Sequence, residues 1–106
     1  MKNWTRIAES YDGGFTEMYL DLYKCNTGLV IKGTSYHYNA GAEKLLCEVK
    51  IPAAIKETED VLRFIAETHS SYPWAKIILE ELKSNKDLIA FIKENNPAEF
   101  DEEIEH

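Results

Sequence analysis

The sequence lacks the motifs that assign a reaction directly. No Gly-Lys-Ser/Thr follows its glycines, so it has no phosphate-binding loop, and its histidines and cysteines are not at metal-site spacing. His37 has no nucleophile and orienting group assignable beside it, so we interpret it as an edge residue that hydrogen-bonds a neighbour. We therefore expect no enzyme activity, no cofactor and no metal.

Cysteine and long apolar runs are also scarce. The two cysteines, Cys25 and Cys47, fall in two predicted strands separated by a third. Such positions are about 10 Å apart, beyond the roughly 7 Å limit for a disulfide, which predicts free thiols. No apolar run approaches the roughly 18 residues that span a bilayer, and the first residues show no signal-peptide pattern. These absences predict a cytoplasmic protein that does not insert in a membrane.

Positive charge is in deficit, with 12 basic and 19 acidic residues and a net charge of −7. Residues 99–105 hold five of the acids, which leaves 12 basic and 14 acidic residues elsewhere. A nearly neutral body disfavours non-specific nucleic-acid binding and an acidic segment favours basic partners. We expect one domain over residues 1–98 and a frayed acidic tail over residues 99–106.

Apolar residues do recur at every second position through residues 15–51, the period of a half-buried strand. A less regular alternation precedes that stretch, and turns rich in Gly and Asn divide it. The predicted strands cover residues 4–10, 15–25, 29–38 and 43–51. Short turns join antiparallel neighbours, so the pattern predicts a four-stranded meander.

Helical spacing follows Pro52 and continues to about residue 68, with a start either soon after Pro52 or at a Thr58 cap. A second helix is predicted from Pro73 to about residue 83. Ser84 with Asp87 three residues later resembles a capping box and predicts a third helix that stops before residue 97. The order predicts an α+β fold: a four-stranded antiparallel β-meander followed by two or three α-helices packed on one face.

Alternation assigns the two faces of this sheet. The face predicted to meet the helices carries Leu20, Leu22, Leu29, Ile31, Cys47 and Val49, with Leu45 in the same phase. The opposite face carries Tyr19, Tyr23, Tyr36 and Tyr38 among Asp21, Lys32, Thr34, Glu48 and Lys50. Tyrosine is enriched at interfaces, so these four tyrosines are candidate partner-binding residues. Ordinary cross-strand pairing explains them equally well.

An RNA-binding module is an alternative for the same face. Bases would stack on the tyrosines, and Lys32 and Lys50 would contact phosphates. Asp21 and Glu48 on that face oppose this interpretation, as does the absence of an Arg/Lys-Gly-Phe/Tyr strand motif.

The acidic tail supplies further candidates, either as an interaction segment or as a solubilising terminus. Its candidate partner-binding residues are Glu99, Asp101, Glu102 and Glu103. In its size, acidity, free thiols, sheet with helices and lack of a catalytic set, the chain resembles the small immunity proteins of bacterial polymorphic toxin systems, including contact-dependent growth inhibition.

That resemblance implies an antitoxin-like inhibitor that neutralises a cognate toxin, commonly a basic nuclease, by direct protein–protein binding. It carries over no individual residue. Four strands followed by a helix are also similar to one half of a Whirly-type nucleic-acid-binding domain. An exposed edge strand additionally allows a homodimer.

Overall fold

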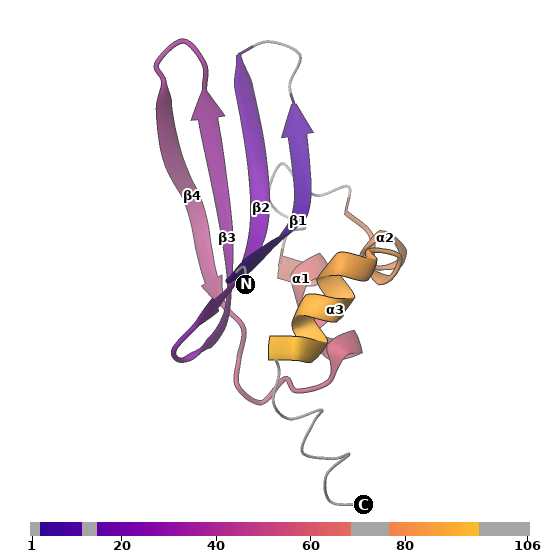
Figure 1. The fold of residues 1–106 in the computed structure, drawn as a ribbon. Coiled ribbons are helices and arrows are strands. Elements are labelled where there is room, and N and C mark those ends of the chain that lie inside the picture. The colour runs from indigo at the N-terminus through magenta and orange to yellow at the C-terminus, as the bar shows by residue number, and fades with distance from the viewer. Residues whose placement is uncertain (1–2, 12–14, 69–76, 96–106) are drawn as a thin grey trace, which may run out of the picture.

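The computed structural model describes residues 3–11, 15–68 and 77–95. They form a four-stranded antiparallel sheet followed by three helices, which confirms the predicted α+β fold (Figure 1). The strands are β1 (Trp4–Tyr11), β2 (Thr16–Cys25), β3 (Gly28–His37) and β4 (Ala42–Lys50). They lie in the order β1-β2-β3-β4, so each strand pairs with its neighbours in sequence, as the short turns predict.

Two glycines shape the turns that the structure describes. Gly28 has φ 128° where β2 turns into β3, and Gly41 has φ 57° just before β4. Such positive φ angles are unfavourable for residues with a Cβ. The N–H of Gly41 donates to the carbonyl of His37 at 2.9 Å, which closes the second of these turns.

Three helices follow, α1 (Thr58–Thr68), α2 (Leu79–Lys83) and α3 (Lys86–Asn95). The later of the two predicted starts is confirmed for α1, which begins at Thr58. Its cap is not Thr58 as predicted, because the first helical hydrogen bond runs from the N–H of Val61 to the carbonyl of Glu57, which makes Glu57 the cap residue. Pro52 instead begins a turn, in which its carbonyl accepts from the N–H of Ile55 at 3.0 Å.

The predicted second and third helices need correction. Ile77 precedes the helix and Ile78 is extended at ψ 156°, so α2 is shorter than predicted; Pro73, its expected first residue, lies outside the described residues. The cap of α3 is Asn85, whose Oδ1 accepts from the N–H of Leu88 at 3.0 Å. The side chain of Ser84 instead bonds to the end of α2, where its Oγ donates to the carbonyl of Glu81 at 2.8 Å. Both residue types cap helices well, and the end of α2 selects between them.

The helices pack on one face of the sheet and enclose the core. The alternating strand residues meet the apolar faces of α1 and α3 there. The fully buried side chains are Leu20, Leu22, Ile31, Val61, Ile65, Leu82, Leu88 and Ile92. Figure 1 shows the helices beside the half of the sheet where β1 begins and β4 ends, while the β3–β4 turn projects away from them.

Irregular register in β1 and β4 changes which residues share a face. In β4 the pairing shifts between Gly33 and Thr34 of its neighbour, so that Leu45 lies opposite Thr34 and is 53 % exposed. Leu45 and Cys47 therefore do not share a face, although the apolar alternation puts them in the same phase. An extra residue in one strand of a pair reverses the alternation beyond it, and such β-bulges are common in edge strands.

Candidate functional site: the open face of the sheet

The face of the sheet turned away from the helices is the candidate site, and we call it the open face. The strand register places its side chains in four cross-strand rows. The first holds Trp4, Tyr23, Val30 and Lys50, and the second holds Arg6, Asp21, Lys32 and Glu48. The third holds Glu9, Tyr19, Thr34 and Leu45, and the fourth holds Tyr11, Glu17, Tyr36 and Glu43.

An ion pair dominates the second row. Arg6 Nε donates to Asp21 Oδ1 at 2.8 Å, and Arg6 Nη2 donates to Asp21 Oδ2 at 3.3 Å. The Arg6 guanidinium also lies 4.2 Å from the ring centre of Tyr19 and 5.2 Å from that of Trp4. The hydrogen bond to Asp21 raises the pKa of Arg6, although burial opposes this. Asp21 is only 4 % exposed, so the expectation that it is a solvent-facing charge is wrong.

Tyr23 belongs to the same closed part of the face. Its ring stacks on Trp4 with a centroid distance of 6.2 Å, and Lys32 Nζ lies 4.9 Å from its centre. Burial is the main cause of the raised pKa of Tyr23. Val30, opposite Tyr23, is only 7 % exposed although it lies on the open face. Across β1, β2 and β3 the first two rows are thus packed by aromatic and cation–π contacts, while Glu48 and Lys50 at their β4 ends are exposed.

The third and fourth rows are more open, and aromatic side chains gather there. Tyr36 and Tyr38 meet edge to face, with ring centres 5.4 Å apart and an interplanar angle of 86°. The hydroxyl of Tyr38 donates to the carboxylate of Glu17 on β2, which raises the pKa of Tyr38 to about 12. This bond ties the end of β3 to β2, so the Tyr36–Tyr38 pair is held in place.

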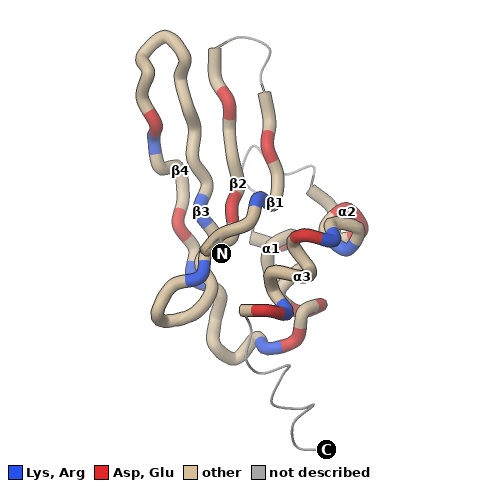
Figure 2. The backbone as a smooth tube through the Cα atoms, viewed as in Figure 1, with Lys and Arg blue, Asp and Glu red and all other residues tan. Residues whose placement is uncertain are grey.

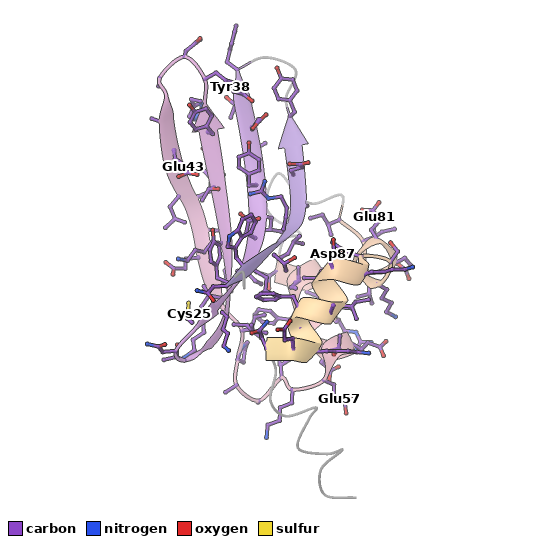
Figure 3. All side chains as sticks on the ribbon, in the orientation of Figure 1. Cys25, Tyr38, Glu43, Glu57, Glu81 and Asp87 are labelled. Atoms are coloured by element: carbon purple, nitrogen blue, oxygen red, sulfur yellow. The ribbon has the colours of Figure 1, made fainter. Side chains whose placement is uncertain are left out.

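The charged residues of these two rows are all acidic, although Arg6 of the second row reaches Glu9, with Nη1 of Arg6 3.7 Å from Oε2 of Glu9. The two rows contain the carboxylates of Glu9, Glu17 and Glu43 and no lysine or arginine. Figure 2 shows acidic positions on the projecting parts of the strands, and Figure 3 shows Tyr38 and Glu43 far from the helices. We call the third and fourth rows, with Tyr38 and Phe15, the distal platform. Its exposed large side chains are Tyr11 at 59 %, Phe15 at 62 %, Tyr38 at 48 % and Leu45 at 53 %.

The four predicted tyrosines therefore separate into two environments. Tyr36 and Tyr38 come together on the distal platform, whereas Tyr23 lies in the packed first row. Tyr19 and Tyr23 are four residues apart on β2, about 13 Å along the strand. The predicted tail residues Glu99, Asp101, Glu102 and Glu103 lie outside the described residues.

Sequence reasoning missed several members of the platform. Tyr11 and Phe15 flank the first predicted turn, and Glu9 joins the open face only because β1 shifts register between Arg6 and Ala8. The aromatic residues beside the turn were a usable signal, because hairpin ends lie on the surface. No sequence signal marks the register shift. The regular alternation of strand residues predicts that Glu9 and Arg6 lie on opposite faces of the sheet.

The remaining sequence candidates have simple environments. His37 Nδ1 lies 3.0 Å from Thr16 Oγ1, a hydrogen bond to a neighbour as expected. Both cysteines are free, with Cys25 exposed and Cys47 buried, and burial raises the pKa of Cys47. In the described ranges no three His, Cys, Asp or Glu side chains come together as a metal site.

The nucleic-acid alternative depends on lysines of the open face. Lys32 is engaged within the protein, because its Nζ lies 3.9 Å from Glu48 Oε1 as well as over the ring of Tyr23. Lys50 is exposed in the first row, far from the Tyr36–Tyr38 pair. Lys32 is in the second row and Lys50 in the first, whereas Tyr36 is in the fourth, so neither lysine lies in the row of Tyr36 or in the row next to it. Base stacking with phosphate contacts requires the lysines to be close to the stacking rings.

Within the described part of the chain, none of the helices has the length and apolar character needed to cross a membrane. No family model, curated protein or solved structure matches this sequence.

Proposed function

We propose that the protein is an antitoxin-like inhibitor, an immunity protein that works in the cytoplasm by binding and not by catalysis. Its partner would be a basic toxin domain, such as a nuclease, held on the distal platform. The observation that carries the proposal is the composition of that platform: exposed aromatic rings among carboxylates, with no lysine or arginine in its two rows. Aromatic anchors and charge complementarity are the usual components of a tight protein interface.

The two kinds of side chain would act at different stages. Glu9, Glu17 and Glu43, together with the acidic tail, attract a basic partner and accelerate encounter. Tyr36 and Tyr38 are then buried against the partner and slow its dissociation. The edge-to-face contact between the two rings reduces the ordering that binding requires, because the pair is already arranged in the free protein.

The test begins with capture of partners from the source cells by the tagged full-length protein, followed by identification of what survives a high-salt wash. The captured protein is then purified, and its affinity and activity are measured with the wild type and with the double variant Tyr36→Ala, Tyr38→Ala. Lys50→Ala is the matched control, because it changes an exposed side chain at the other end of the same face.

We expect a basic protein whose activity stops at equimolar wild-type inhibitor. Loss of one interface anchor typically weakens binding by about 2 kcal/mol or more, which is about thirtyfold. The double variant should therefore bind at least that much more weakly, while the Lys50→Ala control should not. Equal affinity of all three proteins would show that the distal platform is not the interface. Recovery of nucleic acid that depends on Lys32 would support the alternative module instead.

A further inference from the structure

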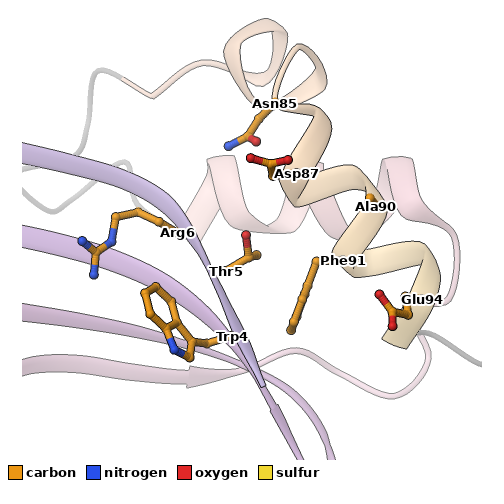
Figure 4. A pocket seen from close by; sticks show the side chains of 8 residues that line it. All are labelled: Trp4, Thr5, Arg6, Asn85, Asp87, Ala90, Phe91 and Glu94. Carbon is orange, nitrogen blue, oxygen red and sulfur yellow. The ribbon is translucent and has the colours of Figure 1, made fainter. Parts of the chain in front are cut away.

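A cleft of about 490 Å³ opens between the edge strand β1 and helix α3. One wall is formed by Trp4–Arg6 and the other by Asp87, Ala90 and Glu94, as Figure 4 shows. Phe91, which belongs to the buried core, lies between the two walls. The volume falls within the range of about 300–1,000 Å³ that is typical of ligand sites. This cleft is separate from the distal platform.

The backbone of β1 is oriented to take part in a strand pairing at this cleft. The N–H of Lys24 on β2 donates at 2.7 Å to the carbonyl of Asn3, the residue just before β1, which makes Asn3 and Lys24 a hydrogen-bonded pair in line with the β1–β2 register. Because such pairs alternate with non-hydrogen-bonded ones, Arg6 opposite Asp21 is a non-hydrogen-bonded pair. The N–H and C=O of Arg6 therefore point away from β2. β1 is the terminal strand in the order of the described sheet.

The α3 wall is anionic. Asp87, Ala90 and Glu94 follow one another at helical spacing on a single face, and all three are exposed. The small side chain of Ala90 leaves space between the two carboxylates, which are about 10 Å apart along the helix axis. Arg6 is the one basic residue among those that line the cleft, and its charge is already paired with Asp21. Electrostatics therefore favours a cationic occupant.

We propose that this cleft binds an extended, lysine- or arginine-bearing segment of a partner protein, which adds to β1 as a further strand. Backbone groups of the segment pair with those of Arg6, the mode in which exposed sheet edges capture peptides. Alternate side chains of the added strand point towards α3 and are about 7 Å apart. Two successive basic side chains of normal length then reach Asp87 and Glu94. The proposal is independent of the distal platform.

The experiment is an NMR titration of the isotope-labelled full chain with a short synthetic peptide in which lysine alternates with valine. A peptide with glutamate in place of lysine is the matched control. We expect the lysine peptide to shift the amide signals of β1 and α3 and to slow hydrogen exchange at Arg6. We expect no such change with the glutamate peptide. A lysine peptide that leaves the β1 amides unchanged at millimolar concentration overturns the proposal.

Charge-reversed variants test the α3 wall. Asp87→Lys combined with Glu94→Lys should weaken binding of the lysine peptide by about tenfold, the effect of two exposed ion pairs. Glu80→Lys combined with Glu81→Lys makes the same charge change on α2 and should leave the affinity within about twofold. Equal effects of the two double variants would mean that only net charge matters, which overturns the assignment to the cleft.

Two further comparisons isolate the backbone pairing and the occupant. Methylation of alternate backbone nitrogens of the lysine peptide should abolish binding, and retained binding would exclude strand addition. If the NMR signals of β1 change with protein concentration, a second copy of the chain binds this edge. If they change on removal of residues 96–106, the chain's own tail binds it. Either result overturns the proposal. The variant Tyr36→Ala, Tyr38→Ala should bind the peptide normally, which separates this result from failure of the proposed function.

Discussion

Replacement of Arg6 by methionine is the most informative change in the packed part of the open face. The substitution removes both hydrogen bonds to Asp21, whose side chain is 5 % exposed, but keeps an unbranched apolar chain beside Trp4 and Tyr19. Loss of one partner from a fully buried ion pair costs about 3–5 kcal/mol, whereas an exposed pair contributes about 0–1 kcal/mol. The side chain of Arg6 is 37 % exposed. The expected loss of stability is therefore about 2 kcal/mol.

Urea unfolding followed by circular dichroism measures this loss. With a slope of about 1–3 kcal/mol per M, a change of about 2 kcal/mol lowers the midpoint by about 1 M. Arg63→Met is the matched control, because it removes an exposed arginine that forms two ion pairs. Its Nη2 lies 3.5 Å from Oε1 of Glu59, and its Nη1 lies 3.4 Å from Oδ1 of Asp60. Arg63→Met should lower the urea midpoint much less than Arg6→Met does, since exposed ion pairs contribute little to stability.

The double variant Arg6→Met, Asp21→Leu separates the ion pair from the packing. Replacing both members of a buried ion pair by apolar residues is often neutral or stabilising. We therefore expect this variant to regain most of the stability that Arg6→Met loses. Two outcomes would show that Arg6 does not offset the cost of burying the Asp21 carboxylate. One is an Arg6→Met variant with the wild-type urea midpoint, and the other is a double variant that is less stable than Arg6→Met.

Three other predictions concern the corrected cap, the thiols and the platform. Asn85→Ala should cost about 1 kcal/mol in urea unfolding and Ser84→Ala less than about 0.5 kcal/mol; the reverse order would restore the predicted capping box. A thiol reagent should label Cys25 rapidly and Cys47 only on unfolding, because burial raises the pKa of Cys47 and shields it; two fast thiols would contradict this. The absorbance of tyrosinate should include a late titration near pH 12 that Tyr38→Phe removes. Since the folded state holds this proton more tightly, stability should fall as the pH rises from about 10 to 12, and a Tyr38→Phe variant with the same late titration would refute the assignment.

Local patterns predicted the elements of this fold well. Apolar alternation in β2 and β3 identified the core-facing side chains of both strands, because a strand repeats every two residues whatever surrounds it. Turn chemistry at Gly28 and Gly41 correctly predicted antiparallel neighbours. Helix ends were less predictable, because Ser84 and Asn85 are both good caps and the choice depends on where α2 stops.

The candidate site was predicted only in outline. The sequence placed four tyrosines on one face, and Tyr36 and Tyr38 do meet there. It did not predict that Asp21 is buried, because the arginine that covers it comes from another strand. Nor did it predict that Leu45 is exposed, since a register shift in an edge strand does not alter the local apolar pattern.

By itself, the sequence determined the class of fold, the strand order and the buried face of the two central strands, because these depend on side-chain period and turn length. Only the tertiary structure decided how the open face is divided into a packed part and an acidic, aromatic part. It also decided that α3 lies beside the edge of β1, which creates the cleft with Asp87 and Glu94 on its wall. Both outcomes depend on strand register and on helix docking, which are set by contacts between residues far apart in the chain.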